Sequence, residues 1–283
     1  MAFTQASGKI IWHADFEPEA QAAIPGPAVN NPDNWNNNVE NPQTEWGLTN
    51  YRNDWPDTGR KGHGLIQRGN ICAASGNTPI PLSPIFTDGI IELEMSWNDD
   101  DSMGVTFRAA QGKGYLVVFG YNETIALMLH DMGNGCAEPG MCLGKTGCDE
   151  PAWGGNLWIE IVLLADIGFE VGGKMAGHFD VWNRGILPED HKHVLYGRIR
   201  AVGNQIDIWY MPIDKDFDRD RVEWMKPLIS VRDEKYSSGT VGIWHESWGN
   251  GIIDNLTITD AGGFSADTRG KLTTYWGTIK VPR

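Results

Sequence analysis

The feature that most constrains the fold is a two-residue alternation of apolar and polar side chains over residues 90–97, IIELEMSW. Successive side chains of a β-strand point to opposite faces of a sheet. One face of this strand would enter a hydrophobic core, and its members are Ile91, Leu93, Met95 and Trp97. The opposite face would carry Glu92, Glu94 and Ser96. The pattern predicts a strand that is buried on one side only.

The two-residue period recurs along the chain, whereas the 3.6-residue period of a helix is rare. Further strands are predicted over residues 105–108, 115–121, 125–130, 157–164, 177–182, 193–201, 205–211, 240–246 and 251–259. Turn sequences rich in Asn, Asp, Gly and Ser separate these stretches. Many strands joined by such turns predict an all-β fold, an antiparallel sandwich or barrel.

The chain has 283 residues and shows no internal repeat and no linker. A single domain over residues 10–260 is therefore expected, with tails over 1–9 and 261–283. Three segments resemble long loop insertions, and they cover residues 18–60, 131–156 and 212–227. The last has four alternating acids but lacks the Gly and Glu of a calcium-binding EF-hand loop, which predicts a solvated charged loop.

The composition excludes several classes of function. Asp and Glu number 37 against 23 Lys and Arg, so the formal net charge is −14. Such a surface repels phosphate backbones and anionic lipid, and neither nucleic acid nor a membrane is an expected partner. No apolar run approaches the ~18–20 residues of a transmembrane helix. Motifs for a nucleophilic serine, a zinc protease, a P-loop or a dinucleotide are absent from the sequence.

The cysteines are even in number, and they are Cys72, Cys136, Cys142 and Cys148. The last three lie in a Gly-rich stretch with the spacing C-x5-C-x5-C, which is not the spacing of a zinc ribbon. Disulfides that staple a loop are favoured over free thiols, and the pairing stays open. The start MAFTQASGKI shows no signal peptide, so the protein is cytosolic or an export signal has been removed. The cysteines favour an extracellular or periplasmic protein.

Four sequence blocks resemble concanavalin A-like, LamG-type jelly rolls. They are IIWHADFE, GIIELEMSWNDDDSMGVTFRAAQGKGYLVVF, HVLYGRIRAVGNQIDIWYM and YSSGTVGIWHESWGNGIIDNLTIT. The resemblance covers residues 88–260 well and residues 10–97 loosely. It implies a two-sheet antiparallel jelly roll with long loop insertions, similar to secreted bacterial jelly rolls such as the 3-keto-disaccharide hydrolases.

Glu92 and Glu94 are the first candidate site, because residues two apart on a strand share a face. Retaining glycosidases use two such carboxylates, one as nucleophile and one as acid. The pair resembles that of laminarinase-type jelly rolls, which carry a third acid where this chain has Ser96. The alternative is a solvated polar face. Arg108 is expected beside Glu92 on that face, and with Tyr115 it would add ligand-binding groups.

Asp254 is the second candidate, because alternation in GIIDNLTI places it in an apolar row. A carboxylate there needs a partner or a cation. The first strand offers Asp15 and Glu17, and first and last strands are commonly neighbours in jelly rolls. Because jelly-roll relatives often hold a structural Ca²⁺ near this junction, a calcium ion bound by Glu17 and Asp254 is expected. The alternative is a buried carboxylate that accepts from backbone amides.

Aromatic residues form the third candidate, since Trp rings stack on sugar rings while polar neighbours bond the hydroxyls. The residues concerned are Trp35, Trp46, Trp55, Trp244, His245 and Glu246. The alternative is that the tryptophans belong to the core. Carbohydrate binding on the concave face and the Trp-rich loops is the expected function. A glycoside hydrolase or lyase on that face, or a surface adhesion or assembly module, is the alternative, and the fold does not choose among them.

Overall fold

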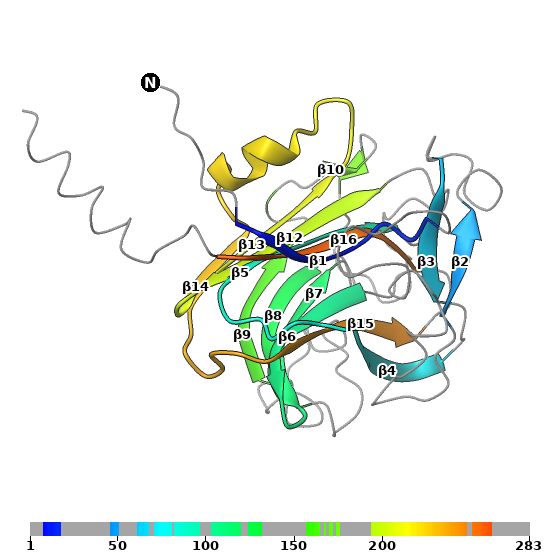
Figure 1. The fold of residues 1–283 in the computed structure, drawn as a ribbon. Helices are drawn as coiled ribbons and strands as arrows, with labels where there is room; N and C mark the ends of the chain where they lie inside the picture. The colour runs from blue at the N-terminus through cyan, green and yellow to red at the C-terminus, as the bar shows by residue number, and fades with distance from the viewer. Residues whose placement is uncertain are drawn as a thin grey trace, which may run out of the picture.

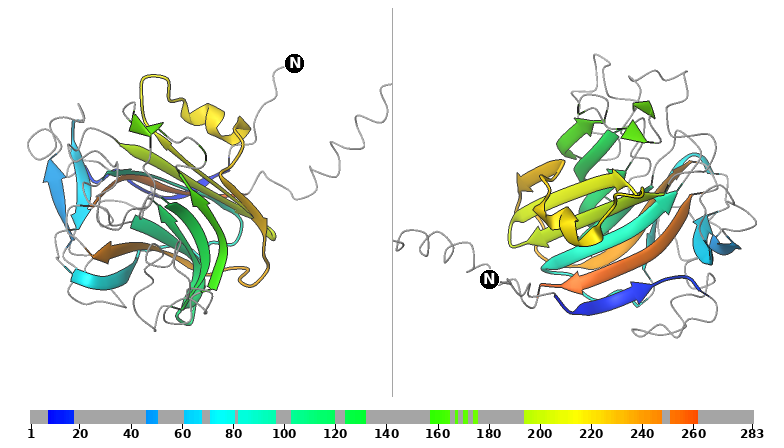
Figure 2. Two further views of the ribbon diagram at one scale, coloured as in Figure 1. Left: turned by 180° about the vertical axis from the view of Figure 1, so that it is seen from behind. Right: turned by 90° about the horizontal axis from the view of Figure 1, so that it is seen from above.

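The computed structural model describes residues 8–17, 46–50, 61–67, 71–80, 82–96, 103–119, 124–131, 157–164, 167, 170–171, 174–175, 194–247 and 251–261. Most of the regular structure in these ranges belongs to two large antiparallel sheets packed face to face (Figures 1 and 2). The predicted all-β sandwich of jelly-roll type is confirmed. The boundaries expected for the domain and its tails stay predictions.

One sheet has eight strands. Its main path runs β14 (Ile229–Arg232), β13 (Gln205–Pro212), β12 (Leu195–Val202), β5 (Gly89–Ser96), β16 (Ile252–Asp260), β3 (His63–Gln67) and β2 (Trp46–Asn50). Off this path, β1 (Ile10–Ala14) pairs with β16. The central strand β5 therefore lies between two strands that come much later in the sequence.

The other sheet has six strands. Their order is β4 (Ile71–Pro79), β15 (Thr240–Ser247), β6 (Met103–Ala110), β7 (Lys113–Phe119), β8 (Thr124–Asp131) and β9 (Leu157–Leu163). Two short strands, β10 (Glu170–Val171) and β11 (Lys174–Met175), pair with each other. The chain passes from one sheet to the other between β5 and β6, so consecutive strands are not always neighbours.

The hydrophobic core lies between the two large sheets. Ile91, Leu93 and Met95 of β5 are buried in it, as the alternation predicted, and Val117 of β7 enters it from the other sheet. Trp97 lies outside the described residues. Each fully buried side chain of this kind stabilises the fold by about 1.5–3 kcal/mol. The outer face of β5 is also largely buried, at Glu94 and Ser96, so the prediction of a strand buried on one side only is wrong: β5 is covered on both faces.

β16 changes its partner along its length. Its first two residues pair with β3, whereas residues 256–259 pair with β1. The register against β5 shifts between Asp254 and Thr257, where Asn255 has a φ of 48°. Asn adopts positive φ more readily than most residues, and such a bulge re-aims the side chains beside it. β1 and β3 thus share one edge of β16, and β5 pairs along the other edge.

The segment over residues 18–60 was expected to be a loop insertion, but it contains β2. Trp46 and Thr49 are buried in this strand, and Leu48 packs against the core. The surrounding Asn and Pro residues concealed the strand, because their composition is typical of loops.

Residues 213–228 contain the 3-10 helix η7 (Arg219–Trp224), the coiled ribbon in Figure 1. Val222 is buried against Tyr196 and Trp209 on the outer face of the eight-stranded sheet. Trp209 also donates from Nε1 to the carbonyl oxygen of Met225 at 2.9 Å. The four alternating acids of this segment are exposed, as predicted for a solvated charged loop, but apolar side chains among the charges dock the segment on the sheet.

Candidate functional site

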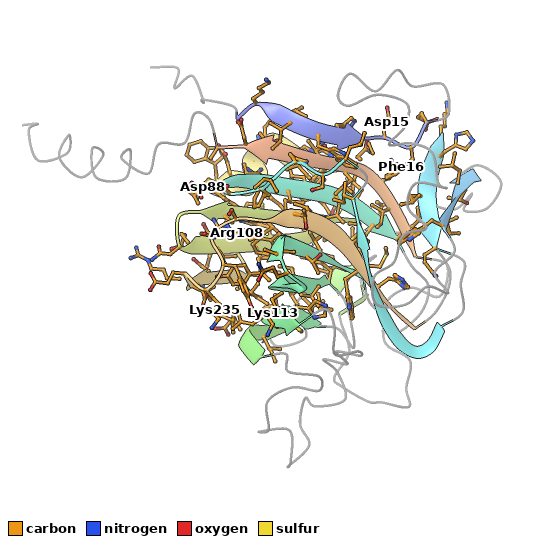
Figure 3. The ribbon with its side chains drawn as sticks, turned by 60° about the horizontal axis from the view of Figure 1, so that its bottom comes forward. Asp15, Phe16, Asp88, Arg108, Lys113 and Lys235 are labelled. Carbon is orange, nitrogen blue, oxygen red and sulfur yellow. The ribbon has the colours of Figure 1, made fainter. Side chains whose placement is uncertain are left out.

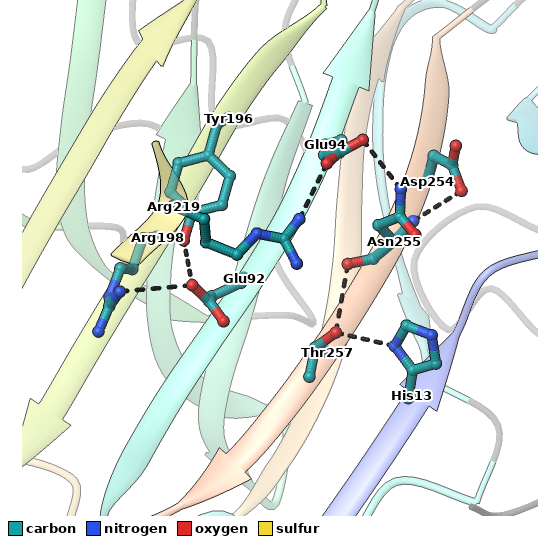
Figure 4. Close-up of polar contacts among 9 residues, drawn as sticks. All are labelled: His13, Glu92, Glu94, Tyr196, Arg198, Arg219, Asp254, Asn255 and Thr257. Atoms are coloured by element: carbon teal, nitrogen blue, oxygen red, sulfur yellow. Dashed lines mark hydrogen bonds and ion pairs between the residues drawn. The ribbon is translucent and has the colours of Figure 1, made fainter. Parts of the chain in front are cut away.

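A row of four side chains crosses the outer face of the eight-stranded sheet (Figure 4). Arg198 of β12 lies opposite Glu92 of β5, and Glu92 lies opposite Thr257 of β16. Thr257 in turn lies opposite His13 of β1. Opposed side chains on neighbouring strands are about 5 Å apart. The register therefore brings a guanidinium, a carboxylate, a hydroxyl and an imidazole together.

The carboxylate of Glu92 is held by two donors from β12. Tyr196 donates a hydrogen bond from its hydroxyl to Oε1. Arg198 Nη1 lies 3.4 Å from the same oxygen. Burial, and then the charge of Glu92, raises the pKa of Tyr196 far above its ordinary value of 10. The phenol therefore stays protonated and keeps donating to Glu92.

The carboxylate of Glu94 is held from two sides. Arg219 Nη2, from η7, donates to Oε1 at 2.9 Å, and Asn255 Nδ2 donates to Oε2 at 3.0 Å. The guanidinium of Arg219 also lies 5.6 Å from the ring centroid of Tyr196, within the range of a cation–π contact. Glu94 thus anchors η7 to the sheet.

His13 is a neutral imidazole at the β1 end of the row. Its Nδ1 lies 2.8 Å from Thr257 Oγ1. Burial, the largest cause, and the nearby charge of Arg219 lower the pKa of His13 below 6.5, although Asp15 and a backbone hydrogen bond oppose them. A neutral ring offers one nitrogen as donor and the other as acceptor.

Arg198 connects the sheet to η7. Besides Glu92, its guanidinium pairs with Glu223, whose Oε2 is 3.6 Å from Nη2. It also lies 5.7 Å from the ring centroid of Trp209. Two ion pairs therefore hold η7 on the sheet, and their charges are arranged in opposite ways. The sheet supplies the arginine in one pair and the glutamate in the other, Arg219 with Glu94.

A pocket of about 470 Å³ opens between η7 and β1. One side is formed by Gly8, Ile10 and His13, the other by Arg219, Asp220 and Glu223, and the floor by Ile90, Glu92, Arg198, Thr257 and Thr259. Donors and acceptors lie around a small apolar patch, Ile10 and Ile90. Such a lining suits a small ligand with many hydroxyl groups.

Arg108 does not lie beside Glu92, and that expectation is corrected. It is in β6 of the other sheet, because the neighbours of β5 are β12 and β16. Its guanidinium is buried and donates to Thr87 O at 2.8 Å, Asp88 Oδ1 at 3.2 Å and Tyr236 O at 3.3 Å (Figure 3). The side chain thus ties together loops at one end of the sandwich.

The other described ligand-binding candidates are buried. Tyr115 is buried, and its hydroxyl donates to the half-buried Asp233. The rings of Trp46 and His245 meet edge to face at 5.7 Å between centroids. Trp244 packs in a separate cluster in the six-stranded sheet. None of these four residues is among those that line the pocket between η7 and β1.

Several candidates fall outside what the structure describes. They are Trp35, Trp55, Cys136, Cys142 and Cys148. Cys72 and Glu246 lie in strands β4 and β15, but their side chains are not described. Disulfides and loop tryptophans at these positions stay predictions.

The two predicted calcium ligands are engaged by protein donors. Glu17 accepts from the backbone N of His63 at 2.7 Å, and Asp254 accepts from the backbone N of Asn255 at 2.7 Å. The second contact matches the alternative of a carboxylate bonded to backbone amides. Among the described residues, no three His, Cys, Asp or Glu side chains gather as a metal-binding group. As arranged, these residues do not form a calcium cage.

No protein-family model matches the chain, and neither does any curated protein. Solved structures of similar fold include the carbohydrate-binding module CBM66 from Bacillus subtilis, with 12% identity and a TM-score of 0.41, covering 69% of this chain and 86% of that chain. The Ca²⁺/Man3GlcNAc-bound VIP36 exoplasmic/lumenal domain has 10% identity and a TM-score of 0.43, covering 83% and 92%. A Bacillus subtilis protein of unknown function with a galectin-like fold has 9% identity and a TM-score of 0.41, covering 90% and 97%.

The part of the chain that the structure describes has no helix with the length and hydropathy needed to cross a membrane.

Proposed function

We propose that this protein binds carbohydrate in the pocket between η7 and β1. The observation that carries the proposal is the row in the pocket floor, in which Arg198, Glu92 and Thr257 lie side by side on neighbouring strands. An extracellular or periplasmic location belongs to the proposal, because clustered cysteines are typical of oxidising compartments.

The size and chemistry of the pocket support a sugar ligand. Small-molecule sites commonly have volumes of about 300–1,000 Å³, and this pocket lies in that range. A sugar hydroxyl both donates and accepts, so it can give its hydrogen to Glu92 and accept one from a neighbouring guanidinium. Because Tyr196 and Arg198 already hold Glu92, the binding groups are fixed before the ligand arrives.

The geometry favours binding over hydrolysis at the predicted carboxylate pair. A retaining glycosidase needs both carboxylates to flank the bond that is cleaved. Glu92 lines the pocket, whereas Glu94 is not among the described residues that line it. Both Glu94 oxygens accept hydrogen bonds, from Arg219 and Asn255. The proposal is therefore a binding protein.

Replacing Glu92 with glutamine tests the proposal. The variant keeps the shape of the side chain but loses a charged acceptor, and a hydrogen bond to a charged group contributes about 1.5–3 kcal/mol. We expect the dissociation constant for a retained glycan to rise about ten- to hundred-fold. The measurement is affinity electrophoresis against a polysaccharide panel, with released reducing ends assayed in parallel.

Glu234→Gln is the matched control, because Glu234 is exposed and is not among the described pocket-lining residues. It should bind like the wild type. If Glu92→Gln folds normally and binds every retained glycan as tightly as the wild type, the site lies elsewhere. Release of reducing ends by the wild type would establish an enzyme instead.

Calcium at the junction of β1 and β16 stays a prediction beside this proposal. If an ion binds there, the folded state gains about 2.7 kcal/mol at a calcium concentration one hundred times the dissociation constant. Adding EDTA should then lower the melting temperature of the wild type but not of Asp254→Asn. An unchanged melting temperature, with no metal by elemental analysis, would show that the backbone amide of Asn255 suffices for Asp254.

A further inference from the structure

Arg198 is buried but incompletely hydrogen-bonded. Its exposed fraction is 6%, and its Nε finds no acceptor among the described residues. The carboxylate oxygens that face it are distant for charged hydrogen bonds, at 3.4 Å for Glu92 and 3.6 Å for Glu223. Buried polar groups almost always have a hydrogen-bond partner. Nε itself is enclosed, but Arg198 lines the pocket, and its two long ion pairs leave part of the guanidinium's donor capacity for a ligand acceptor.

The surrounding charges restrict what that acceptor can be. Three carboxylates line the pocket, from Glu92, Asp220 and Glu223, against two guanidinium groups. An anionic ligand would meet repulsion from these carboxylates, and to pair with Arg198 it would have to displace one of them. A hydroxyl group fits without displacement, because it accepts from Arg198 and donates to Glu92 or Glu223.

We infer that the pocket selects an uncharged sugar with adjacent hydroxyl groups, and that Arg198 is the residue that anchors it. This inference rests on the proposed carbohydrate function and names the class of glycan. Two neighbouring hydroxyls match the planar guanidinium, whose donors project in fixed directions. Sugars that carry a carboxylate on the ring, the hexuronates, are disfavoured by the same acids.

The test combines one substitution with two classes of ligand. Arg198→Lys keeps the positive charge but removes Nε–H and the planar fork. Isothermal titration calorimetry would measure binding of neutral hexose oligosaccharides and of hexuronate oligosaccharides of equal length. We expect the wild type to bind a neutral oligosaccharide at least ten-fold more tightly than any hexuronate. Arg198→Lys should weaken that binding at least ten-fold.

Arg200→Lys is the matched control, since Arg200 is in the same strand, pairs with Asp207 at 3.1 Å and is not among the described pocket-lining residues. It should bind like the wild type. If Arg198→Lys does not fold, an NMR titration of the wild type replaces it, and the Nε–H resonance of Arg198 should shift when the neutral oligosaccharide is added.

The possible failures are distinguishable. If the wild type prefers hexuronates, carbohydrate binding stands but the inference about ligand charge is overturned. If Arg198→Lys binds like the wild type, or if the Nε–H resonance does not move at saturation, Arg198 is not the anchor. If the wild type retains no glycan of either class, the proposed function and this inference fall together.

Discussion

Replacing Trp12 with alanine should lower the free energy of unfolding by about 3–5 kcal/mol, the usual cost of removing a buried tryptophan side chain. Trp12 is fully buried in the main core, on the strand β1 that forms one side of the pocket. Domains commonly have only about 5–15 kcal/mol of stability. The variant is therefore expected to be close to unfolding, and urea denaturation followed by circular dichroism would measure the loss.

Ile10→Ala is the control for Trp12→Ala on the same strand. Ile10 is 47% exposed, so its truncation removes little buried area and should cost less than about 1 kcal/mol. Comparing the two variants shows whether the loss of stability comes from removing the buried Trp12 ring or from truncating any side chain of β1. Equal losses in both variants, or a loss below about 1 kcal/mol for Trp12→Ala, would contradict the burial of Trp12 in the core.

The stability of the wild type should fall as the pH drops from about 6.5 to about 4, because of His245. Burial lowers the pKa of His245 from 6.5 to about 4 in the folded protein. The unfolded chain therefore binds the proton first as the pH falls, and protonation pulls the equilibrium toward unfolding. His245 contributes its full stabilisation above pH 6.5. A pKa lowered this far corresponds to a loss of about 3 kcal/mol in the free energy of unfolding near pH 4.

His245→Phe isolates this effect, because the ring beside Trp46 is kept and the titrating group is removed. Urea denaturation at several pH values should show a smaller loss of stability in the variant than in the wild type. Part of the pH dependence should persist, since the pKa of His13 is also lowered. Identical pH profiles for the two proteins would show that His245 is not buried as a neutral ring.

The sandwich could be predicted from sequence because strand periodicity is a local property. Ile91 and Leu93 alternate with Glu92 and Glu94 within a single strand, so the buried and outer faces of β5 follow without knowledge of its neighbours. The same period runs through β12, where Tyr196 and Arg198 alternate with apolar residues and could have been recognised as the outer face.

The pairing of strands could not be predicted from such local patterns. Arg108 was expected beside Glu92 because consecutive strands often pair, but the chain crosses to the other sheet between β5 and β6. The hydrogen-bond partners of Glu94 could not be predicted from the sequence either. Arg219 reaches Glu94 from a helix that apolar contacts of Val222 dock on the sheet, and a charged loop sequence does not reveal that docking.

The position of β5 between β12 and β16 also determines when the pocket can form during synthesis. Glu92 leaves the ribosome well before Arg198 and Thr257, its partners in register. At translation rates of about 5–20 residues per second, β5 waits on the order of ten seconds for β16. Contacts between strands so distant in sequence also form slowly. The floor of the pocket is therefore assembled late, and in a nascent chain that has not yet produced β16 one backbone edge of β5 has no partner strand.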